Sequence, residues 1–170
     1  MKLALAAIFL AGLPPSVHPW PIGVGPRYHP PAAPAPVRAG RPVGWMTCSV
    51  YRVRFDAHIE VFASRRVAIL PRGIGRGPRS CWYPVSTNAP TGVVRLTQPV
   101  TVGDLFRIWG QPLGPHRLLS FRGTTIAFLD GRRWQRDPRD IWIAPYSQIV
   151  LEIGGYVAPH PSYLFPKGTP

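Results

Sequence analysis

The 170-residue sequence is poor in acidic residues and cysteines, and it has no long apolar run. Seven aspartates and glutamates stand against 20 lysines and arginines, so internal salt bridges cannot neutralise the surface. No apolar run reaches the roughly 18 residues that a membrane-spanning helix requires. Proline and glycine, by contrast, are abundant at 23 and 17 residues. They exclude an all-helical bundle, because proline removes a backbone donor and glycine weakens helix interiors.

The N-terminal 44 residues are predicted to stay outside the folded body. Residues 1–17 have a lysine followed by a short apolar stretch and Pro14-Pro15, which is typical of an export signal. A buried N-terminal helix is the alternative. Residues 18–44 are rich in proline and contain no acidic residue, which favours a disordered tether. The tether could also serve as a ligand for a proline-recognising partner. A single globular domain is predicted over residues 45–170.

Local patterns within this domain predict strands around one short helix. Polar and apolar residues alternate over 55–61 and again over 148–153, and shorter strands are expected at 67–70 and 93–97. Thr101 and Asp104 have capping-box spacing for a helix that Gly110 ends. Asp130-Gly131 predicts a hairpin between 124–129 and 132–135.

This order of elements predicts an α+β fold: a small two-layer domain with a mostly antiparallel or mixed β-sheet and one short helix. Strands before and after a helix that crosses the sheet make a β-grasp-like arrangement. The alternative is an all-β sandwich.

The only two cysteines, Cys48 and Cys81, are predicted to form a disulfide, since an even pair in an exported protein is typically bonded. Closing this loop would contribute about 3–4 kcal/mol. A redox pair or a pair of metal-binding thiols is the other interpretation, and the absence of Cys-x-x-Cys spacing disfavours it.

The basic residues are almost all arginine and are spread along the chain, with mild concentrations at 72–79 and 132–139. Such a charge supports adhesion to an anionic envelope surface, either lipid headgroups or cell-wall polymers. The predicted partners are therefore an unknown protein or that surface. We expect no specific nucleic acid and no transmembrane span in the mature chain, which is placed outside the cytoplasm, secreted or in the cell envelope.

Several short motifs between Cys48 and Pro166 resemble a family of small exported microbial proteins with no assigned reaction. The motifs are Cys81-Trp82-Tyr83, Gly92-Val93-Val94, the helix end Ile108-Trp109-Gly110-Gln111-Pro112-Leu113, Asp137-Pro138-Arg139, residues 149–154, and Tyr163-Leu164-Phe165-Pro166. The resemblance covers nearly the whole predicted domain.

The resemblance implies a histidine metal site that this chain has largely lost. The family has a His-x-His-x-His strand, where this chain has Arg54, Asp56 and His58, and a Cys…His-Thr-His-Asp motif, where Ser86 and Asn88 replace the histidines. A further histidine before the last strand is replaced by Tyr146. Alternating histidines on a strand would suit zinc or copper. Arg54, Ser86, Asn88 and Tyr146 are therefore the degenerate positions.

Asp56, His58 and Glu60 share one face of the predicted strand, at i, i+2 and i+4. They are the candidate residual metal ligands. The competing interpretation is a solvated polar strand face or an ion-paired cluster with nearby arginines.

Signals of catalysis are weak, because no serine lies in a nucleophile elbow and Glu60 and Glu152 both lie within predicted strands. We therefore predict no catalytic residues and no cofactor. The predicted function is a non-catalytic exported binding or structural module with a degenerate histidine metal site. The alternative is an extracytoplasmic zinc- or copper-binding protein that uses Asp56 and His58.

Overall fold

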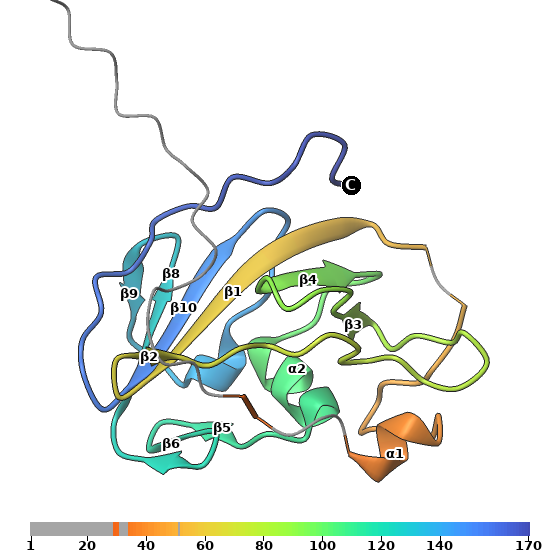
Figure 1. The fold of residues 1–170 in the computed structure, drawn as a ribbon, viewed down its shortest axis with the longest axis horizontal. Coiled ribbons are helices and arrows are strands. Elements are labelled where there is room, and N and C mark those ends of the chain that lie inside the picture. The colour runs from red at the N-terminus through yellow and green to blue at the C-terminus, as the bar shows by residue number, and fades with distance from the viewer. Residues whose placement is uncertain (1–28, 31–33, 51) are drawn as a thin grey trace, which may run out of the picture.

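The computed structural model describes residues 29–30, 34–50 and 52–170, and its core is a mixed β-sheet with one helix packed against it (Figure 1). The predicted export signal and most of the predicted tether lie outside these residues. In chain order the elements are α1 (Ala35–Arg38), β1 (Phe55–Ala63), β2 (Arg66–Val67), β3 (Val85–Ser86), β4 (Val93–Leu96), α2 (Val102–Trp109), β5 (Leu113–Gly114), β6 (Arg117–Leu118), β7 (Phe121–Arg122), β8 (Thr125–Leu129), β9 (Arg132–Trp134), the 3-10 helix η1 (Pro138–Asp140) and β10 (Gln148–Ile153).

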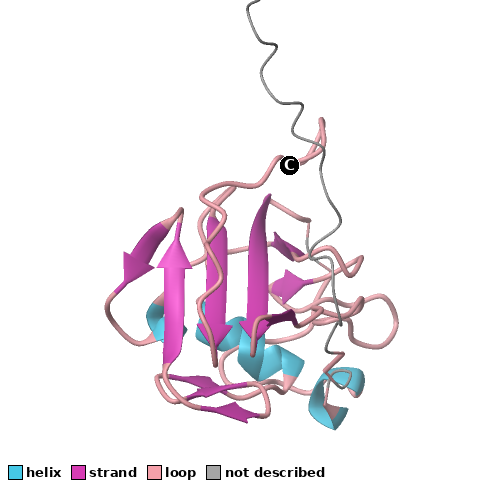
Figure 2. Cartoon of the chain, turned by 60° about the vertical axis from the view of Figure 1, so that its left-hand side comes forward, coloured by secondary structure: helices cyan, strands magenta, loops and turns pink. Residues whose placement is uncertain are grey.

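The main sheet has seven strands in the order β3-β4-β1-β10-β8-β9, with β2 paired to β1. The central pair β1 and β10 is parallel, and the other pairs are antiparallel. A small second sheet contains β5, β6 and β7. Figure 2 shows the strands with helices behind them and an extended loop running across the front. The α+β prediction is confirmed, and the all-β alternative is wrong because α2 forms a layer on the sheet.

Helix α2 forms where its capping residues predict it. The Thr101 side chain accepts from the Asp104 N–H, and the Asp104 carboxylate accepts from the Thr101 N–H, so two N-terminal donors are satisfied. Gly110 ends the helix in the left-handed region, with φ of 73°. Leu105, Ile108 and Trp109 are fully buried and face the sheet.

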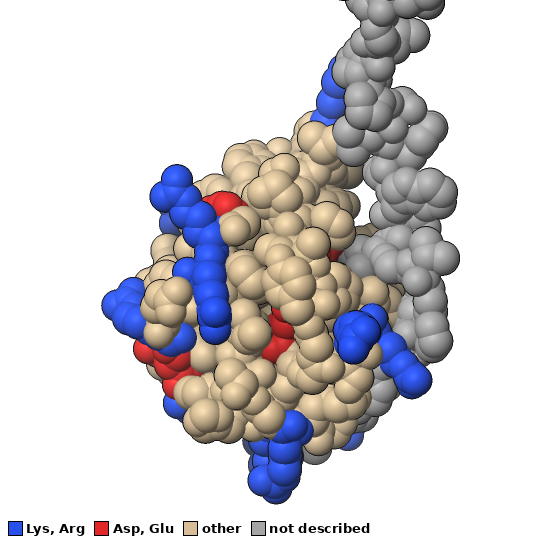
Figure 3. Space-filling model, turned by 90° about the vertical axis from the view of Figure 1, so that its left-hand side faces the viewer, with Lys and Arg blue, Asp and Glu red and all other residues tan. Residues whose placement is uncertain are grey.

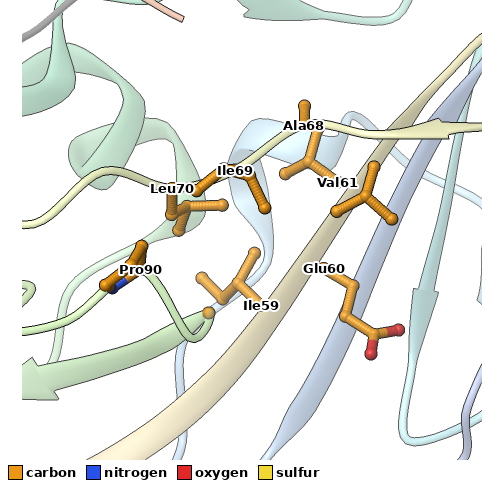
Figure 4. A pocket seen from close by; sticks show the side chains of 9 residues that line it. Ile59, Glu60, Val61, Ala68, Ile69, Leu70 and Pro90 are labelled. Atoms are coloured by element: carbon orange, nitrogen blue, oxygen red, sulfur yellow. The ribbon is translucent and has the colours of Figure 1, made fainter. Parts of the chain in front are cut away.

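The main apolar core lies between α2 and the sheet. Ala57, Ile59 and Val61 of β1 contribute to it, as do Ile149, Leu151 and Ile153 of β10. Figure 4 shows a small apolar cavity of about 10 Å³ at the edge of this core, beside residues 67–70. The side chain of Glu60 points away from the cavity, toward the other face of the sheet (Figure 4). A space of this size holds no ligand larger than a water molecule.

The opposite face of the sheet is covered by the last 16 residues, 155–170, which we call the C-terminal segment. It contains no helix or strand and runs across the sheet as the blue trace of Figure 1. A second apolar cluster forms on this side from Phe62, Val67, Ile69, Phe128 and Val150, with Val157 of the C-terminal segment packed against it.

Cys48 and Cys81 form the predicted disulfide. Next to it, Ser49 and Trp82 pair their backbones in both directions, so two distant loops are held side by side. A Cβ atom at Gly77 would collide with both sulfur atoms. One glycine of the loop at 71–79 is thus required by close packing.

Packed structure begins earlier than the sequence suggests. Helix α1 lies within the range predicted as a disordered tether, 18–44, and its Val37 is fully buried. The Tyr83 hydroxyl donates to the Arg41 carbonyl, which fixes the chain that follows α1. Residues 34–44 are therefore part of the folded body. None of the helices in the described ranges has the length and apolar character that a membrane span requires.

Candidate functional site

The polar face of β1 is buried. Asp56, His58 and Glu60 point away from α2 and have exposed fractions of 3%, 0% and 6%. Gln148 and Glu152 of the neighbouring strand β10 are buried on the same face. The expectation of a solvated strand face is wrong, because the C-terminal segment covers it. The alternative interpretation, an ion-paired cluster with nearby arginines, holds for part of this face, as the contacts of each side chain show.

His58 has both ring nitrogens engaged. Nε2 lies 2.9 Å from the Thr91 carbonyl oxygen and Nδ1 lies 2.7 Å from the side-chain oxygen of Gln148, Oε1. Burial lowers the pKa of His58, against the opposing effect of these hydrogen bonds and of Glu60. Both of these neighbours are acceptors, whereas a neutral ring carries a single N–H. A neutral ring therefore donates from Nε2 to Thr91 and accepts at Nδ1 once the Gln148 amide is turned, so that its nitrogen, which otherwise has no partner in the described residues, faces the ring. Neither nitrogen keeps a free lone pair for a metal ion.

The C-terminal segment contacts this face through two rings. Tyr163 stacks on His58, with ring centroids 3.8 Å apart and an interplanar angle of 11°. His160 Nδ1 lies 2.9 and 3.0 Å from the two carboxylate oxygens of Glu60. No sequence pattern predicts this role of His160, because it lies in a proline-rich loop 100 residues from Glu60. These contacts anchor the segment to β1.

Two buried carboxyl groups are poorly satisfied. Asp56 Oδ1 has no hydrogen-bond partner in the described residues, and the Arg95 Nε is 3.8 Å away, too far for a hydrogen bond. Burial raises the pKa of Asp56, and the Arg95 charge opposes this. Glu152 is fully buried, and neither of its oxygens has a hydrogen-bond partner in the described part of the chain. Burial raises the pKa of Glu152; a backbone donor at Val157 opposes the effect without reaching hydrogen-bond geometry.

Asp56, His58 and Glu60 do not form a common ligand set. Each side chain contacts a different neighbour, and no group of three or more His, Cys, Asp or Glu residues within 29–30, 34–50 and 52–170 could hold a metal ion. The degenerate positions differ in exposure: Arg54 and Asn88 are exposed, while Ser86 is buried in β3, where it pairs with Arg95. Tyr146 is 51% exposed and packs its ring against Phe165. The residues present do not fit a zinc or copper ion.

A groove of about 410 Å³ opens between the end of the C-terminal segment and one edge of the polar face. Asp56, Val93 and Arg95 of β1 and β4 form one side, and the loop at 88–91 continues it. The other side is formed by the C-terminal segment, through Tyr163 and residues 166–170. The sequence placed Asp56 and Asn88 in the candidate site but gave no signal for Arg95 or Tyr163.

The surface has a larger excess of basic over acidic residues than the composition of the whole chain indicates. Four of the seven acidic residues are buried: Asp56, Glu60, Asp104 and Glu152. Every described arginine except Arg95 is exposed. Asp137 is engaged by Arg139, whose hydrogen bonds lower the pKa of that carboxyl group. On the side shown in Figure 3, basic side chains project at several separate places and acidic ones form only small areas.

In comparisons with family models, curated proteins and solved structures, the chain has no significant match in any of the three. The family resemblance of the motifs therefore stays a prediction.

Proposed function

We propose that this protein is a non-catalytic extracytoplasmic module that adheres to phosphate-bearing surfaces of the cell envelope. The observation that carries the proposal is the separation of charge between interior and surface. Burial of Asp56, Glu60, Asp104 and Glu152 removes most negative charge from the exterior, while the arginines remain there. An exterior of one sign attracts anionic surfaces through a field that salt screens.

The edge strand β9 offers a contact area in which arginines lie beside an aromatic ring. Arg132, Arg133 and Arg136 are exposed along and just beyond it, and the Arg136 guanidinium lies 4.7 Å from the centre of the Trp134 ring. Trp142, farther along the chain, is 61% exposed. Arginines recognise phosphate by paired N–H donors, and tryptophan favours the interface between water and lipid. These properties support attachment to a phosphate-rich layer.

Cosedimentation with lipid vesicles tests the proposal. We expect binding to phosphatidylcholine vesicles that contain phosphatidylglycerol, none to phosphatidylcholine alone, and loss of binding at high salt. Soluble polyphosphate should compete if a cell-wall polymer supplies the phosphate. If the protein bound neither the vesicles containing phosphatidylglycerol nor soluble polyphosphate at low salt, the proposal would be contradicted.

A matched pair of triple variants locates the contact. Replacing Arg132, Arg133 and Arg136 by Gln should weaken vesicle binding roughly 100-fold, at about 1 kcal/mol for each arginine near the lipid. The same replacement of Arg72, Arg76 and Arg79, which are also exposed, removes equal charge elsewhere and should have a smaller effect. Equal losses would assign adhesion to the whole surface instead of β9.

Metal analysis of the purified protein tests the non-metal part of the proposal. We expect no stoichiometric zinc or copper, because His58 has no free nitrogen for a ligand bond. A bound ion that disappears in His58→Ala would support the metal-binding alternative instead.

A further inference from the structure

Strand β9 leaves one end of the main sheet open. It is the last strand in the order, at the left-hand side of Figure 1, and within the described chain it pairs only with β8. At the opposite end, the N–H of Thr87, just after β3, donates to the Ile74 carbonyl, and the Thr87 carbonyl accepts from the Gly73 N–H. The loop at 71–79 thus covers that end of the sheet. An open edge, by contrast, is a template on which another chain can form a strand.

The register of the hairpin between β8 and β9 directs the backbone of Arg133 outward. The turn at 130–131 has two residues at positive φ, and Leu129 pairs with Arg132 beside it. In such a hairpin the pair next to the turn exchanges hydrogen bonds, and the following pair does not. That following pair is Phe128 with Arg133. The N–H and carbonyl of Arg133 therefore point away from β8.

The contacts of β8 with β10 agree with this direction. The Asp130 N–H donates to the Gln148 carbonyl, so alternate residues of β8, Phe128 included, direct their backbone groups toward β10. No hydrogen bond joins the Arg133 backbone to a described residue outside β8. Arg133 thus presents one donor and one acceptor at the open edge.

Arginine side chains lie on both faces of this edge. Trp134 packs against the main core, so Arg132, two positions earlier, projects on the α2 side of the sheet. Arg133 projects on the opposite side, across from Phe128 of the second apolar cluster. The Arg136 guanidinium lies over the Trp134 ring, just beyond the strand. An extended chain laid along β9 would therefore meet a guanidinium group on each of its faces.

We propose that β9 binds an extended acidic segment of a partner protein, which adds to the main sheet as a further strand. The segment would accept a hydrogen bond from the Arg133 N–H and donate one to the Arg133 carbonyl. Consecutive acidic side chains of the segment point to opposite faces, where they would pair with Arg132 and Arg133. A phosphate-bearing lipid or polymer can pair with the arginines but has no strand backbone for the Arg133 N–H and carbonyl. This proposal does not depend on the adhesion proposed above.

A second copy of this chain does not fit the same edge. Two β9 strands side by side would bring arginines close to arginines, and like charges across a strand pair are destabilising. Four of the seven acidic residues are buried, and Asp137 is engaged by Arg139. The remaining two, Asp130 and Asp140, are too far apart in the sequence to form an acidic strand. The partner is therefore a different protein.

Fluorescence anisotropy with a labelled peptide tests the proposal. The probe is a peptide of about eight residues, a usual strand length, with glutamates at its central positions and threonine and valine at its ends. We expect it to bind, and we expect the same peptide with glutamine in place of glutamate to bind about 10-fold more weakly or less. In the complex the amide proton of Arg133 should exchange more slowly with solvent. If the glutamate peptide does not bind, or if exchange at Arg133 is unchanged, the proposal is overturned.

Two variants of Arg133 separate strand addition from the attraction of charge. Arg133→Gln removes the guanidinium group and keeps the N–H, and should weaken peptide binding several-fold. Arg133→Pro removes both and should weaken binding about 10-fold further. Proline is accepted on an edge strand where its nitrogen faces solvent, so we expect this variant to fold. Vesicle binding should be the same in both variants, because they lose equal charge.

N-methylation of the central glutamates applies the same test to the unchanged protein. It removes the N–H donors of the peptide and should weaken binding about 10-fold or more. Equal affinity of folded Arg133→Gln and Arg133→Pro, or undiminished binding of the methylated peptide, would show that only charge is recognised and would reject strand addition. A parent that binds vesicles but not the glutamate peptide would refute this proposal alone. The reverse result would refute adhesion and support strand addition.

Discussion

The two faces of strand β1 are both buried, but by different means. Toward α2, Ile59 and Val61 pack only against other apolar side chains. On the opposite face, Asp56, His58 and Glu60 are covered by the C-terminal segment and by loops. Packing on the helix side requires only that the side-chain volumes fit together. On the opposite face each buried polar atom also requires a hydrogen-bond partner. Period-two alternation thus separates the faces of a strand without revealing which of them meets water.

The two faces also differ in how many of their buried polar atoms have hydrogen-bond partners. On the helix side the buried side chains are mostly apolar, and the indole nitrogen of Trp109 has no hydrogen-bond partner in the described chain. On the other side, His58 and Glu60 have good partners, but Asp56 and Glu152 do not. Incomplete satisfaction of buried polar atoms lowers stability. We therefore expect the helix side to dominate stability and the other side to dominate the pH dependence.

The largest effect is expected on the helix side. Ile59→Ala should lower the free energy of unfolding by about 2–5 kcal/mol, because a buried isoleucine loses its contacts and leaves a cavity. Urea denaturation measures the loss. Val50→Ala, at a position 84% exposed, serves as control and should change stability by less than about 0.5 kcal/mol. A loss below about 1 kcal/mol in Ile59→Ala would contradict the core described here.

A smaller loss is expected where the C-terminal segment meets His58. Tyr163→Ala should cost about 1–2 kcal/mol, because the ring stacks on His58 and is only partly buried. Leu164→Ala, the next residue and 68% exposed, is the matched control and should be nearly neutral. Thermal unfolding of both variants measures the difference. Equal melting temperatures would show that the segment does not hold this face.

Removing the charge of Glu152 is expected to increase stability at neutral pH. Because burial raises the pKa of Glu152, the folded protein keeps this proton at pH values where the unfolded chain has lost it. Stability therefore falls as pH rises from the unfolded value of about 4.3 through the raised folded value. Glu152→Gln should be more stable than the parent by about 1 kcal/mol at pH 7.

This advantage of Glu152→Gln should disappear below about pH 4, where both states of the parent are protonated. Urea denaturation across this range measures it. Asp140→Asn, which removes an exposed carboxylate, should show no such trend. A parallel pH profile for Glu152→Gln and the parent would show that Glu152 is not buried as described.

The smallest effect is expected for the ion pair between His160 and Glu60. His160→Ala should cost roughly 0.5 kcal/mol, because the histidine side chain is 64% exposed and water screens the pair. A double-mutant cycle with Glu60→Gln isolates the pair from other losses. A coupling energy near zero would assign the anchoring of the segment to Tyr163 alone.

Elements with local signals could be predicted from the sequence. The capping residues Thr101 and Asp104 fix the start of α2, and Asp130-Gly131 fixes the hairpin of β8 and β9. The two-residue strands β3, β5, β6 and β7 were missed, because only their partners define them. Helix α1 was missed because prolines surround it; tertiary contacts, including those of the buried Val37, stabilise it.

Only the part of the candidate site that lies on β1 could be predicted from the sequence. Alternation correctly placed Asp56, His58 and Glu60 on one face. Their partners come from far along the chain: Gln148 lies 90 residues from His58, and His160 lies 100 residues from Glu60. Spacing within a segment cannot reveal such contacts, and a proline-rich C-terminus gives no periodic signal of burial.

The parallel pairing of β1 with β10 determines when this molecule can fold. His58 aligns with Gln148, so the centre of the sheet forms only after the residues of β10 have been synthesised, about 90 positions after β1 begins to emerge. Closing so long a loop carries a large entropic cost and slows folding. A nascent chain that ends before Gln148 would present β1 without its central neighbour, and its apolar edge would be open to aggregation. The native sheet is therefore completed only once β10 is available to pair with β1.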